Sequence, residues 1–320
     1  MTINGYVGTY TTNQSQGIYQ IKIIGNKIDD IRLFAHIQNP KYLAFAGKDD
    51  QYIAAVCDLN EKNTTYKSGV ALFDKKGNKI SSLAYEDKTS CFIACKNNFL
   101  YTANYHEGTC SIIKVEENCE LSLMKKIHIK PKAGCHQVLF FKDKFLVPCL
   151  FLDKIFIYDS NYVLVQEISF PENSGPRHAV FSKDNEFLYV VGELDNIVYT
   201  IRTCDMKIVS KAFILGDNIS HLKDSSAIRM SNDGEYIYIS TRTQDVISVF
   251  KVTKEKLDLK QIISSGGKHP RDFCILQDVI IILNRDTNTV VVMDLEKGLI
   301  KNTVQTCTLP EAVALLLEEK

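Results

Sequence analysis

The sequence has no tryptophan, no excess of either charge and no long hydrophobic run. Its 38 basic residues are balanced by 38 acidic ones, whereas nucleic-acid-binding proteins normally carry a basic excess or stripe. The longest apolar runs, such as 279–283 and 313–317, have the length of strands and are too short to span a membrane. The missing tryptophan excludes repeat scaffolds that depend on a Trp-Asp dipeptide. Neither nucleic acid nor a membrane is therefore expected as a partner.

The cysteines also lack a pattern that would give them a chemical role. There are ten of them, but no Cys-x-x-Cys pair, so a zinc site is not expected. The first residues show no basic segment followed by an apolar core, so no signal peptide is expected. Cysteines without a secretory signal are expected to be reduced packing residues of a cytoplasmic protein.

Short apolar runs rich in valine, isoleucine, tyrosine and phenylalanine are separated by glycine, asparagine and aspartate throughout the chain. This is the chemistry of strands and tight turns, and helical periodicity is almost absent. The clearest unit has apolar runs at 178–182, 187–191 and 197–201, joined by polar breaks. The sequence therefore predicts an all-β protein.

The strand pattern repeats along the chain. Six units end their second strands at Val56, Ala103, Pro148, Val191, Ser240 and Leu283, at intervals of 43–49 residues. Such a period, with several strands per unit, is typical of a β-propeller. Residues 5–23 supply part of a seventh unit, and 312–316 supply its missing first strand, with a short helix as the alternative for 312–316. We therefore expect residues 1–320 to form a single domain, a seven-bladed β-propeller closed by N- and C-terminal strands in one blade.

The hairpins of such a repeat predict where functional side chains gather. The first strand of each unit leads away from one face and the second returns to it, so residues opening strand one and closing strand two share that face. Several of these positions are polar or charged: His136, Arg177, His178, Arg271, Asp272, Asp58, Asn104, Glu193, Arg242, Asn284 and Arg285, with Arg229 at the third position of a first strand. Polar residues are also ordinary turn residues. The convergence of arginines, two histidines and carboxylates is what favours a functional site.

The residue types in this set suit an anionic ligand and proton transfer. Arginine offers forked donors to phosphate or carboxylate groups, and histidine or glutamate can act as a general base. The chain has no Gly-x-Ser-x-Gly elbow and no His-Glu-x-x-His motif. The four histidines His36, His106, His128 and His221 have no supporting pattern, and we expect them to be surface or packing residues.

Several short motifs occur in a distinctive order. The central ones are Gly175-Pro-Arg-His178 and Phe187-Leu-Tyr-Val-Val-Gly-Glu193, flanked by Gly8-Thr-Tyr-Thr11, Asn39-Pro-Lys-Tyr-Leu43, Gly134-Cys-His136 and His269-Pro-Arg-Asp-Phe273. In this order they resemble the seven-bladed propeller lactonases, the bacterial propeller type of 6-phosphogluconolactonase. The resemblance implies a cytoplasmic enzyme of the pentose phosphate pathway that hydrolyses 6-phospho-D-glucono-1,5-lactone to 6-phosphogluconate without a cofactor or metal. A small anionic sugar lactone is then the expected partner, and a closed ring is sufficient as a monomer.

The resemblance also suggests roles for individual residues. Water would attack the lactone carbonyl, with Glu193 or His136 as the base and Arg177 as a stabiliser of the oxyanion. The expected catalytic residues are therefore Glu193, His136 and Arg177. The expected substrate-binding residues are His178, Arg229, Arg242, Arg271, Asn104 and Arg285. A structural alternative is that Glu193 simply pairs with Arg177.

The chain also departs from the family pattern. Gly134 and Arg229 stand where many relatives have histidine, and Cys149 stands where they often have aspartate. These departures leave two alternatives open. One is a lactonase or lactonising enzyme for another sugar-acid or muconate-type lactone. The other is a non-catalytic propeller that binds a protein partner, since a fold alone does not determine function.

Overall fold

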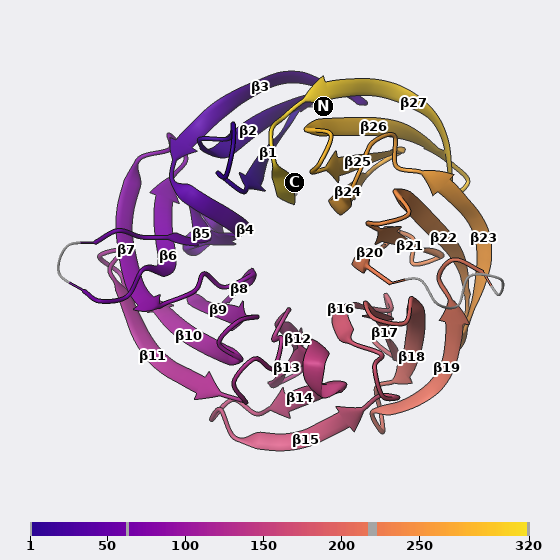
Figure 1. Ribbon diagram of the computed structural model, residues 1–320, viewed down its shortest axis with the longest axis horizontal. Helices are drawn as coiled ribbons and strands as arrows, with labels where there is room; N and C mark the ends of the chain where they lie inside the picture. Colours follow the sequence, from indigo (N-terminus) through magenta and orange to yellow (C-terminus); the bar gives the residue numbers. More distant parts are fainter. Residues whose placement is uncertain (1, 62–63, 217–222, 319–320) are drawn as a thin grey trace.

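The computed structural model of the chain describes residues 2–61, 64–216 and 223–318, which form seven four-stranded antiparallel sheets. Figure 1 shows the sheets as blades arranged in a ring, with the first strand of each blade beside a central channel. The predicted seven-bladed β-propeller is therefore confirmed. No helix in these three ranges is long and apolar enough to cross a membrane.

The blades follow one another in chain order around the ring. Blade 1 consists of β28 (Ala312–Leu317), β1 (Thr2–Thr9), β2 (Gly17–Ile24) and β3 (Lys27–His36). Blade 2 consists of β4 (Gln38–Ala46), β5 (Tyr52–Asp58), β6 (Ser68–Asp74) and β7 (Lys79–Glu86). Blade 3 consists of β8 (Phe92–Lys96), β9 (Phe99–Asn104), β10 (Thr109–Val115) and β11 (Leu121–His128).

The remaining four blades have the same organisation. Blade 4 consists of β12 (Leu139–Phe141), β13 (Lys144–Cys149), β14 (Lys154–Tyr158) and β15 (Leu164–Ser169). Blade 5 consists of β16 (Pro176–Phe181), β17 (Phe187–Gly192), β18 (Ile197–Arg202) and β19 (Lys207–Phe213). Blade 6 consists of β20 (Ser225–Met230), β21 (Tyr236–Thr241), β22 (Val246–Thr253) and β23 (Lys256–Ser264), and blade 7 of β24 (Pro270–Leu276), β25 (Val279–Asn284), β26 (Thr289–Glu296) and β27 (Leu299–Thr308). Two short 3₁₀ turns, η1 (Lys48–Asp50) and η2 (Leu150–Leu152), lie in blades 2 and 4.

Burial explains why the inner and outer strands differ in sequence. The β25 strand reads as a continuous apolar run and is buried along its whole length, because both of its faces pack against neighbouring blades. The outer strand β23 instead alternates between exposed and more buried residues, as expected for a strand with one solvated face. The core consists of apolar clusters between adjacent blades, each built from two blades.

The ring closes where the two ends of the chain meet. The β28 strand pairs antiparallel with β1, so residues 312–316 form the predicted strand and the helical alternative is wrong. The carboxylate of Glu311, just before β28, accepts hydrogen bonds from the backbone N–H groups of Asn13 (3.0 Å), Gln14 (3.1 Å) and Ser15 (3.2 Å). Thr12 also donates to it, through its N–H and its hydroxyl. This one side chain therefore fastens the 12–15 loop to the closing strand.

Candidate active site

The functional side chains reach the channel through irregularities in the first strands. In blade 5, Arg177 and His178 together lie opposite a single residue of β17. The extra residue of the corresponding irregularity is Arg271 in blade 7 and Val313 in blade 1. Such β-bulges break the alternation of side chains and redirect them, and they are common beside active sites. The bulges therefore place these residues at one end of the channel.

His136 reaches the same end of the channel in a different way. We predicted that it opens the first strand of blade 4, but β12 begins only at Leu139. The register between this segment and β13 shifts between Cys135 and Leu139: Cys135 is bridged to Cys149, whereas Leu139 pairs with Leu146. Pro148 of β13 has no N–H to donate to a regular ladder, yet its carbonyl accepts the N–H of His136 at 3.1 Å. His136 is therefore held in place although it lies outside the strand.

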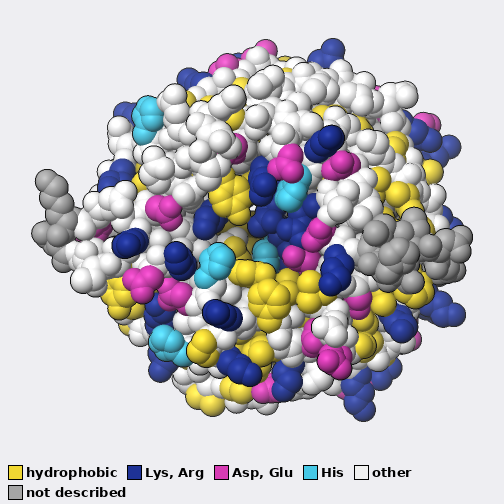
Figure 2. Space-filling view, in the orientation of Figure 1, with side chains coloured by type: hydrophobic (Ala, Val, Ile, Leu, Met, Phe, Trp, Pro, Cys, Tyr) yellow, Lys and Arg dark blue, Asp and Glu magenta, His cyan; other side chains and the backbone are white. Residues whose placement is uncertain are grey.

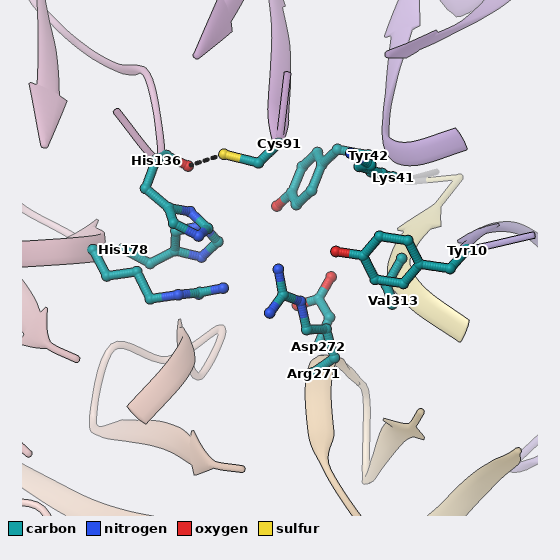
Figure 3. A pocket seen from close by; sticks show the side chains of 10 residues that line it. Tyr10, Lys41, Tyr42, Cys91, His136, His178, Arg271, Asp272 and Val313 are labelled. Atoms are coloured by element: carbon teal, nitrogen blue, oxygen red, sulfur yellow. Dashed lines mark hydrogen bonds between the residues drawn. The ribbon is translucent and has the colours of Figure 1, made fainter. Parts of the chain in front are cut away.

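A pocket lies where these residues meet, and its volume measured to the open mouth is about 340 Å³. The lining residues come from six blades: Tyr10, Lys41, Tyr42, Cys91, His136, Arg177, His178, Arg271, Asp272 and Val313. Figure 3 shows their side chains directed toward a common centre. Four of the predicted site residues, His136, Arg177, His178 and Arg271, therefore line a single pocket.

Two histidines form a buried pair in this pocket. The Nδ1 atom of His136 lies 3.1 Å from the Nε2 atom of His178, so one ring donates a hydrogen bond to the other. Burial and the nearby charge of Arg177 hold the pKa of both rings well below the usual 6.5. Both imidazoles are therefore neutral at neutral pH, and a neutral ring has a lone pair that can accept a proton.

Arg177 is buried, and Glu193 compensates its charge. The side chain of Arg177 is 2% exposed, and its Nε atom lies 2.6 Å from Oε2 of Glu193. The other carboxylate oxygen of Glu193, Oε1, lies 2.7 Å from Nη2 of Arg242, and Arg177 also donates to the carbonyl of Ser226 at 2.7 Å. Burial lowers the pKa of Arg177 to about 9, although Glu193 opposes this shift. Glu193 is thus a bridge between two arginines behind the pocket, not one of its lining residues.

The pocket holds more positive charge than its carboxylates balance. Asp272 is paired with Arg229, whose Nη2 lies 2.6 Å from Oδ1 of the aspartate. Within the ranges that the structure describes, neither Arg271 nor Lys41 has a carboxylate within ion-pairing distance. Figure 2 shows lysine and arginine side chains gathered at the centre of this face, with histidine beside them. An anionic ligand would supply the missing negative charge.

Five predicted residues lie outside the pocket wall: Glu193 and Arg242, which form the ion pairs described above, and three others. Arg229, together with Cys274, Leu316 and other residues, lines a separate hollow at the opposite ends of the first strands. Asn104 is fully buried and donates to the carboxylate of Glu86 (2.6 Å) and to a backbone carbonyl, which makes it part of the loop structure. Arg285 lies at the rim, over the ring of Tyr10 at 5.5 Å. The prediction that all the chosen residues converge therefore holds for only part of the set.

The structure also reveals pocket residues that the sequence reasoning missed. Tyr10, Lys41, Tyr42 and Cys91 were not chosen, although the first three belong to motifs that carry the family resemblance. Pro40 could have pointed to Lys41, because a proline inside a strand marks a bulge or an edge. The pairing of β4 with β5 does shift between Gln38 and Tyr42. Burial raises the pKa of both Tyr42 and Cys91 to about 12, so both side chains are neutral at neutral pH.

The histidines that we left as surface or packing residues have different surroundings. His36 and His128 are exposed on the outer strands β3 and β11, as expected. His106 lines a second hollow beside the pocket, together with several lysines. His221 lies outside the described residues.

Two of the departures from the family pattern lie outside the pocket wall. Cys149 is fully buried, and its Sγ lies 3.5 Å from Sγ of Cys135 in an apolar cluster. Gly134 has φ +74°, a left-handed conformation that glycine adopts without strain. A side chain there would meet Leu150 and Phe151, so a histidine would need neighbouring atoms to move. Neither residue lines the pocket, so these two departures do not alter its wall.

Comparisons with known proteins agree with this architecture. Residues 4–317 match the family described as "Lactonase, 7-bladed beta-propeller". A 6-phosphogluconolactonase of Bacillus subtilis strain 168 is 26% identical over 324 residues, covering 92% of this chain and 91% of the relative. The crystal structure of a protein from Lactobacillus plantarum superposes with a TM-score of 0.90 at 25% identity, covering all of both chains. That of a periplasmic gluconolactonase from Pseudomonas aeruginosa gives 0.85 at 21% identity, covering 99% of each chain.

These matches extend over the whole chain, so they do not come from one short shared motif. The family match leaves out only three residues at each end of the chain. The structural likeness covers the whole chain and therefore every blade. The chain therefore belongs to the family of seven-bladed β-propeller lactonases and is a lactone hydrolase.

Proposed function

We propose that this lactonase hydrolyses 6-phospho-D-glucono-1,5-lactone to 6-phosphogluconate. The observation that carries the proposal is one pocket that combines two neutral, buried imidazoles with cations lacking a counter-ion. A phosphorylated sugar lactone offers a carbonyl for a base-assisted attack and negative charge for the cations. The Bacillus subtilis relative named 6-phosphogluconolactonase supports this choice of substrate.

In the proposed reaction, water attacks the lactone carbonyl carbon C1 while His136 accepts one of its protons. The carbonyl oxygen becomes an oxyanion, which the guanidinium groups of Arg177 and Arg271 stabilise. The bond between C1 and the ring oxygen then breaks, and His136 returns the proton to that oxygen. One water molecule is consumed, and no cofactor enters the balance.

The low pKa of His136 suits the second half of this reaction. Burial and the charge of Arg177 disfavour the imidazolium, so a proton taken from water is readily released to the leaving ring oxygen. The same shift makes the neutral ring a weak base, which a δ-lactone tolerates because it also opens in water without a catalyst. Positioning and modest proton transfer are then sufficient.

We assign Glu193 a positioning role and His136 the role of the base. The sequence left both as candidates, but both carboxylate oxygens of Glu193 already face arginines, at 2.6 and 2.7 Å. Glu193 is also not among the residues that line the pocket, whereas His136 is. The contribution of Glu193 is to hold Arg177 in the buried position from which the guanidinium reaches the pocket.

A second candidate is an unphosphorylated sugar lactone. The observation that favours it is the small size of the pocket, which is about 340 Å³ even when measured to its open mouth. The departures at Gly134 and Cys149 do not support a different lactone, because neither residue lines the pocket. Lys41 favours the phosphorylated substrate, because a neutral lactone would leave its charge unpaired.

We further propose a setting for the enzyme. The substrate belongs to the pentose phosphate pathway, and a phosphorylated sugar is found inside the cell. The ten cysteines are thiols and form no disulfide bond, which fits a reducing cytoplasm. The ring is closed by β28, so a monomer is sufficient, and a small anionic sugar lactone is the partner that the pocket suits.

The test is a hydrolysis assay with the purified protein on 6-phosphogluconolactone and on gluconolactone. The spontaneous rate, measured without enzyme, is subtracted from each reaction. We expect a higher kcat/KM for the phosphorylated lactone. Equal or higher kcat/KM for gluconolactone would favour the second candidate, and no acceleration of either lactone would reject both.

A further inference from the structure

A second hollow lies beside the pocket on the same face of the propeller. We call it the lysine pocket, and its volume measured to its open mouth is about 810 Å³. It lies between blades 2 and 3 and is lined by Gln38, Lys41, Asp58, Asn60, Lys67, Ser68, Asp87, Lys88, Thr89 and His106. Lys41 lines both hollows, so the two are adjacent. Figure 2 shows lysine, arginine and histidine side chains extending from the central funnel over this side of the ring.

The lysine pocket is almost entirely polar, and one of its two carboxylates is already bound within the protein. Asp58 accepts hydrogen bonds from the side chains of Asn39 (2.7 Å), Ser68 (3.3 Å) and Thr89. These three donors fix the carboxylate against the floor of the pocket. The second carboxylate, that of Asp87, belongs to an exposed residue.

The ammonium groups of the lysine pocket are free to bind a ligand. Among the residues that the structure describes, Lys41, Lys67 and Lys88 form no ion pair with any carboxylate. Lys41 only approaches the ring of Tyr10, at 5.8 Å. Three lysines against two carboxylates leave a net positive charge when His106 is neutral. Unpaired cations around a polar hollow are a suitable environment for a phosphate group.

His106 adds a neutral hydrogen-bonding group to this environment. Partial burial, together with the charges of Lys41 and Lys88, lowers its pKa below 6.5. Lys41, Lys88 and His106 all line the lysine pocket, so the two lysines and the ring border the same space. A neutral imidazole can donate one N–H to a phosphate oxygen, while the ammonium groups supply charge and further donors.

We propose that the lysine pocket binds the phosphate group of a phosphorylated sugar acid whose lactone end lies at His136. The inference rests on the proposed function and deepens it by assigning the two ends of the substrate to two hollows. In a 6-phosphorylated lactone, the phosphate is carried by C6, at the other end of the molecule from the reacting carbon C1. The shared residue, Lys41, lies between the two positions. Arg177 and Arg271 are then left to the oxyanion and the product carboxylate.

This arrangement also accounts for the small volume of the pocket at His136. Measured to the open mouth, the pocket at His136 has about 340 Å³ and the lysine pocket about 810 Å³, so the pocket at His136 is the narrower of the two. If the phosphate lies in the wider lysine pocket, only the ring must enter the narrow one. The pocket at His136 then selects the lactone, and the lysine pocket selects the phosphate.

The test measures the binding of the two products, 6-phosphogluconate and gluconate, by calorimetry, so that it does not depend on turnover. The variants are Lys88→Gln and Lys67→Gln. The matched control is Lys211→Gln, an exposed lysine on the outer strand β19 of blade 5. We expect the wild type to bind 6-phosphogluconate more tightly than gluconate. Lys88→Gln should reduce that preference about 10-fold, while Lys211→Gln leaves it unchanged.

Two results would overturn the proposal. One is a preference for 6-phosphogluconate that neither lysine variant reduces. The other is a wild type that binds both products equally. The proposed function is tested separately, by the hydrolysis assay. If the wild type did not hydrolyse either lactone but still preferred 6-phosphogluconate in a lysine-dependent way, the proposed function would be wrong and the phosphate site would stand.

Discussion

The guanidinium of Arg177 and the carboxylate of Glu193 form a buried ion pair, with 2.6 Å between Nε and Oε2. The arginine side chain is 2% exposed and the glutamate side chain 13%. A bulge in β16 directs the arginine inward, and the loop after β17 supplies the glutamate. Removing one partner of such a pair leaves a buried charge without compensation, which is more costly than losing a surface contact.

The first prediction concerns the stability provided by this pair. Glu193→Gln keeps the shape of the side chain but removes the charge shared by Arg177 and Arg242, so we expect a loss of about 3–5 kcal/mol in the free energy of unfolding. Urea denaturation measures the change. The matched control is Glu167→Gln, which removes an exposed ion pair with Lys154 and should cost at most about 1 kcal/mol. Equal losses in the two variants would show that the buried pair is not a special stabilising contact.

The second prediction concerns pH. Because burial and Arg177 hold the pKa of His136 well below 6.5, the ring stays neutral as the pH falls through the range where an ordinary histidine takes up a proton. The enzymatic rate of lactone hydrolysis should therefore stay nearly constant from about pH 8 to pH 6 and decline only in more acidic solution. A pH–rate profile of kcat/KM, corrected for spontaneous hydrolysis, measures this. A loss of activity centred near pH 6.5 would contradict the assigned environment of His136.

The third prediction separates function from stability at Arg271. This half-buried cation repels Arg177, as its lowering effect on the pKa of Arg177 shows, and no described carboxylate pairs with it. Arg271→Gln should therefore leave the free energy of unfolding unchanged or slightly higher, because a repulsion is removed. The same variant should lose about 100-fold or more in kcat/KM, because it lacks a charge that stabilises the oxyanion.

Thermal unfolding and lactone hydrolysis, measured on the same preparation of Arg271→Gln, test this separation. A loss of stability comparable to that of Glu193→Gln would show that Arg271 is a structural residue. Activity equal to the wild type would remove it from the reaction.

The fourth prediction concerns closure of the ring at Glu311. Burial alone would raise the pKa of this carboxyl, but hydrogen bonds from Thr12 and from the N–H groups of Asn13 and Ser15 outweigh it and lower the pKa below 4.5. The ionised carboxylate contributes its full stabilisation at pH values above the pKa that Glu311 has in the unfolded chain. This contribution is lost as the pH falls through the lower pKa that Glu311 has in the folded protein. Glu311→Gln should therefore cost about 1.5–3 kcal/mol at neutral pH.

Urea denaturation at neutral and acidic pH checks the effect of Glu311→Gln. The difference between wild type and variant should shrink in acid, because the wild-type carboxyl is then protonated as well. A difference that stays constant as the pH falls below about 4 would mean that the charge of Glu311 does not fasten the loop.

The architecture could be predicted from the sequence because it depends on local signals that repeat. Strand runs such as 187–191 and their turns recur every 43–49 residues, and each copy supports the others. The closing strand at 312–316 could be inferred since residues 5–23 lacked a partner. These inferences needed the period of the pattern and no knowledge of which strands exchange hydrogen bonds.

The site could be predicted only in part, because its geometry depends on register. Arg177, His178 and Arg271 face the pocket from bulges, and a bulge is defined by the pairing of two strands. Arg229 has the same residue type but follows the bulge of its own strand, so it lines the opposite hollow. His106 had no local pattern because its neighbours, Lys41 among them, come from another blade.

The most direct test of the account is the kcat/KM for 6-phosphogluconolactone of the wild type and of His136→Gln, measured side by side with the spontaneous rate subtracted. The amide of glutamine keeps a polar side chain of similar length but cannot accept the proton from water. The account predicts that the wild type accelerates hydrolysis and that His136→Gln loses about 100-fold or more of kcat/KM while unfolding at the same urea concentration. A wild type no faster than the spontaneous reaction, or a variant as active as the wild type, would contradict it.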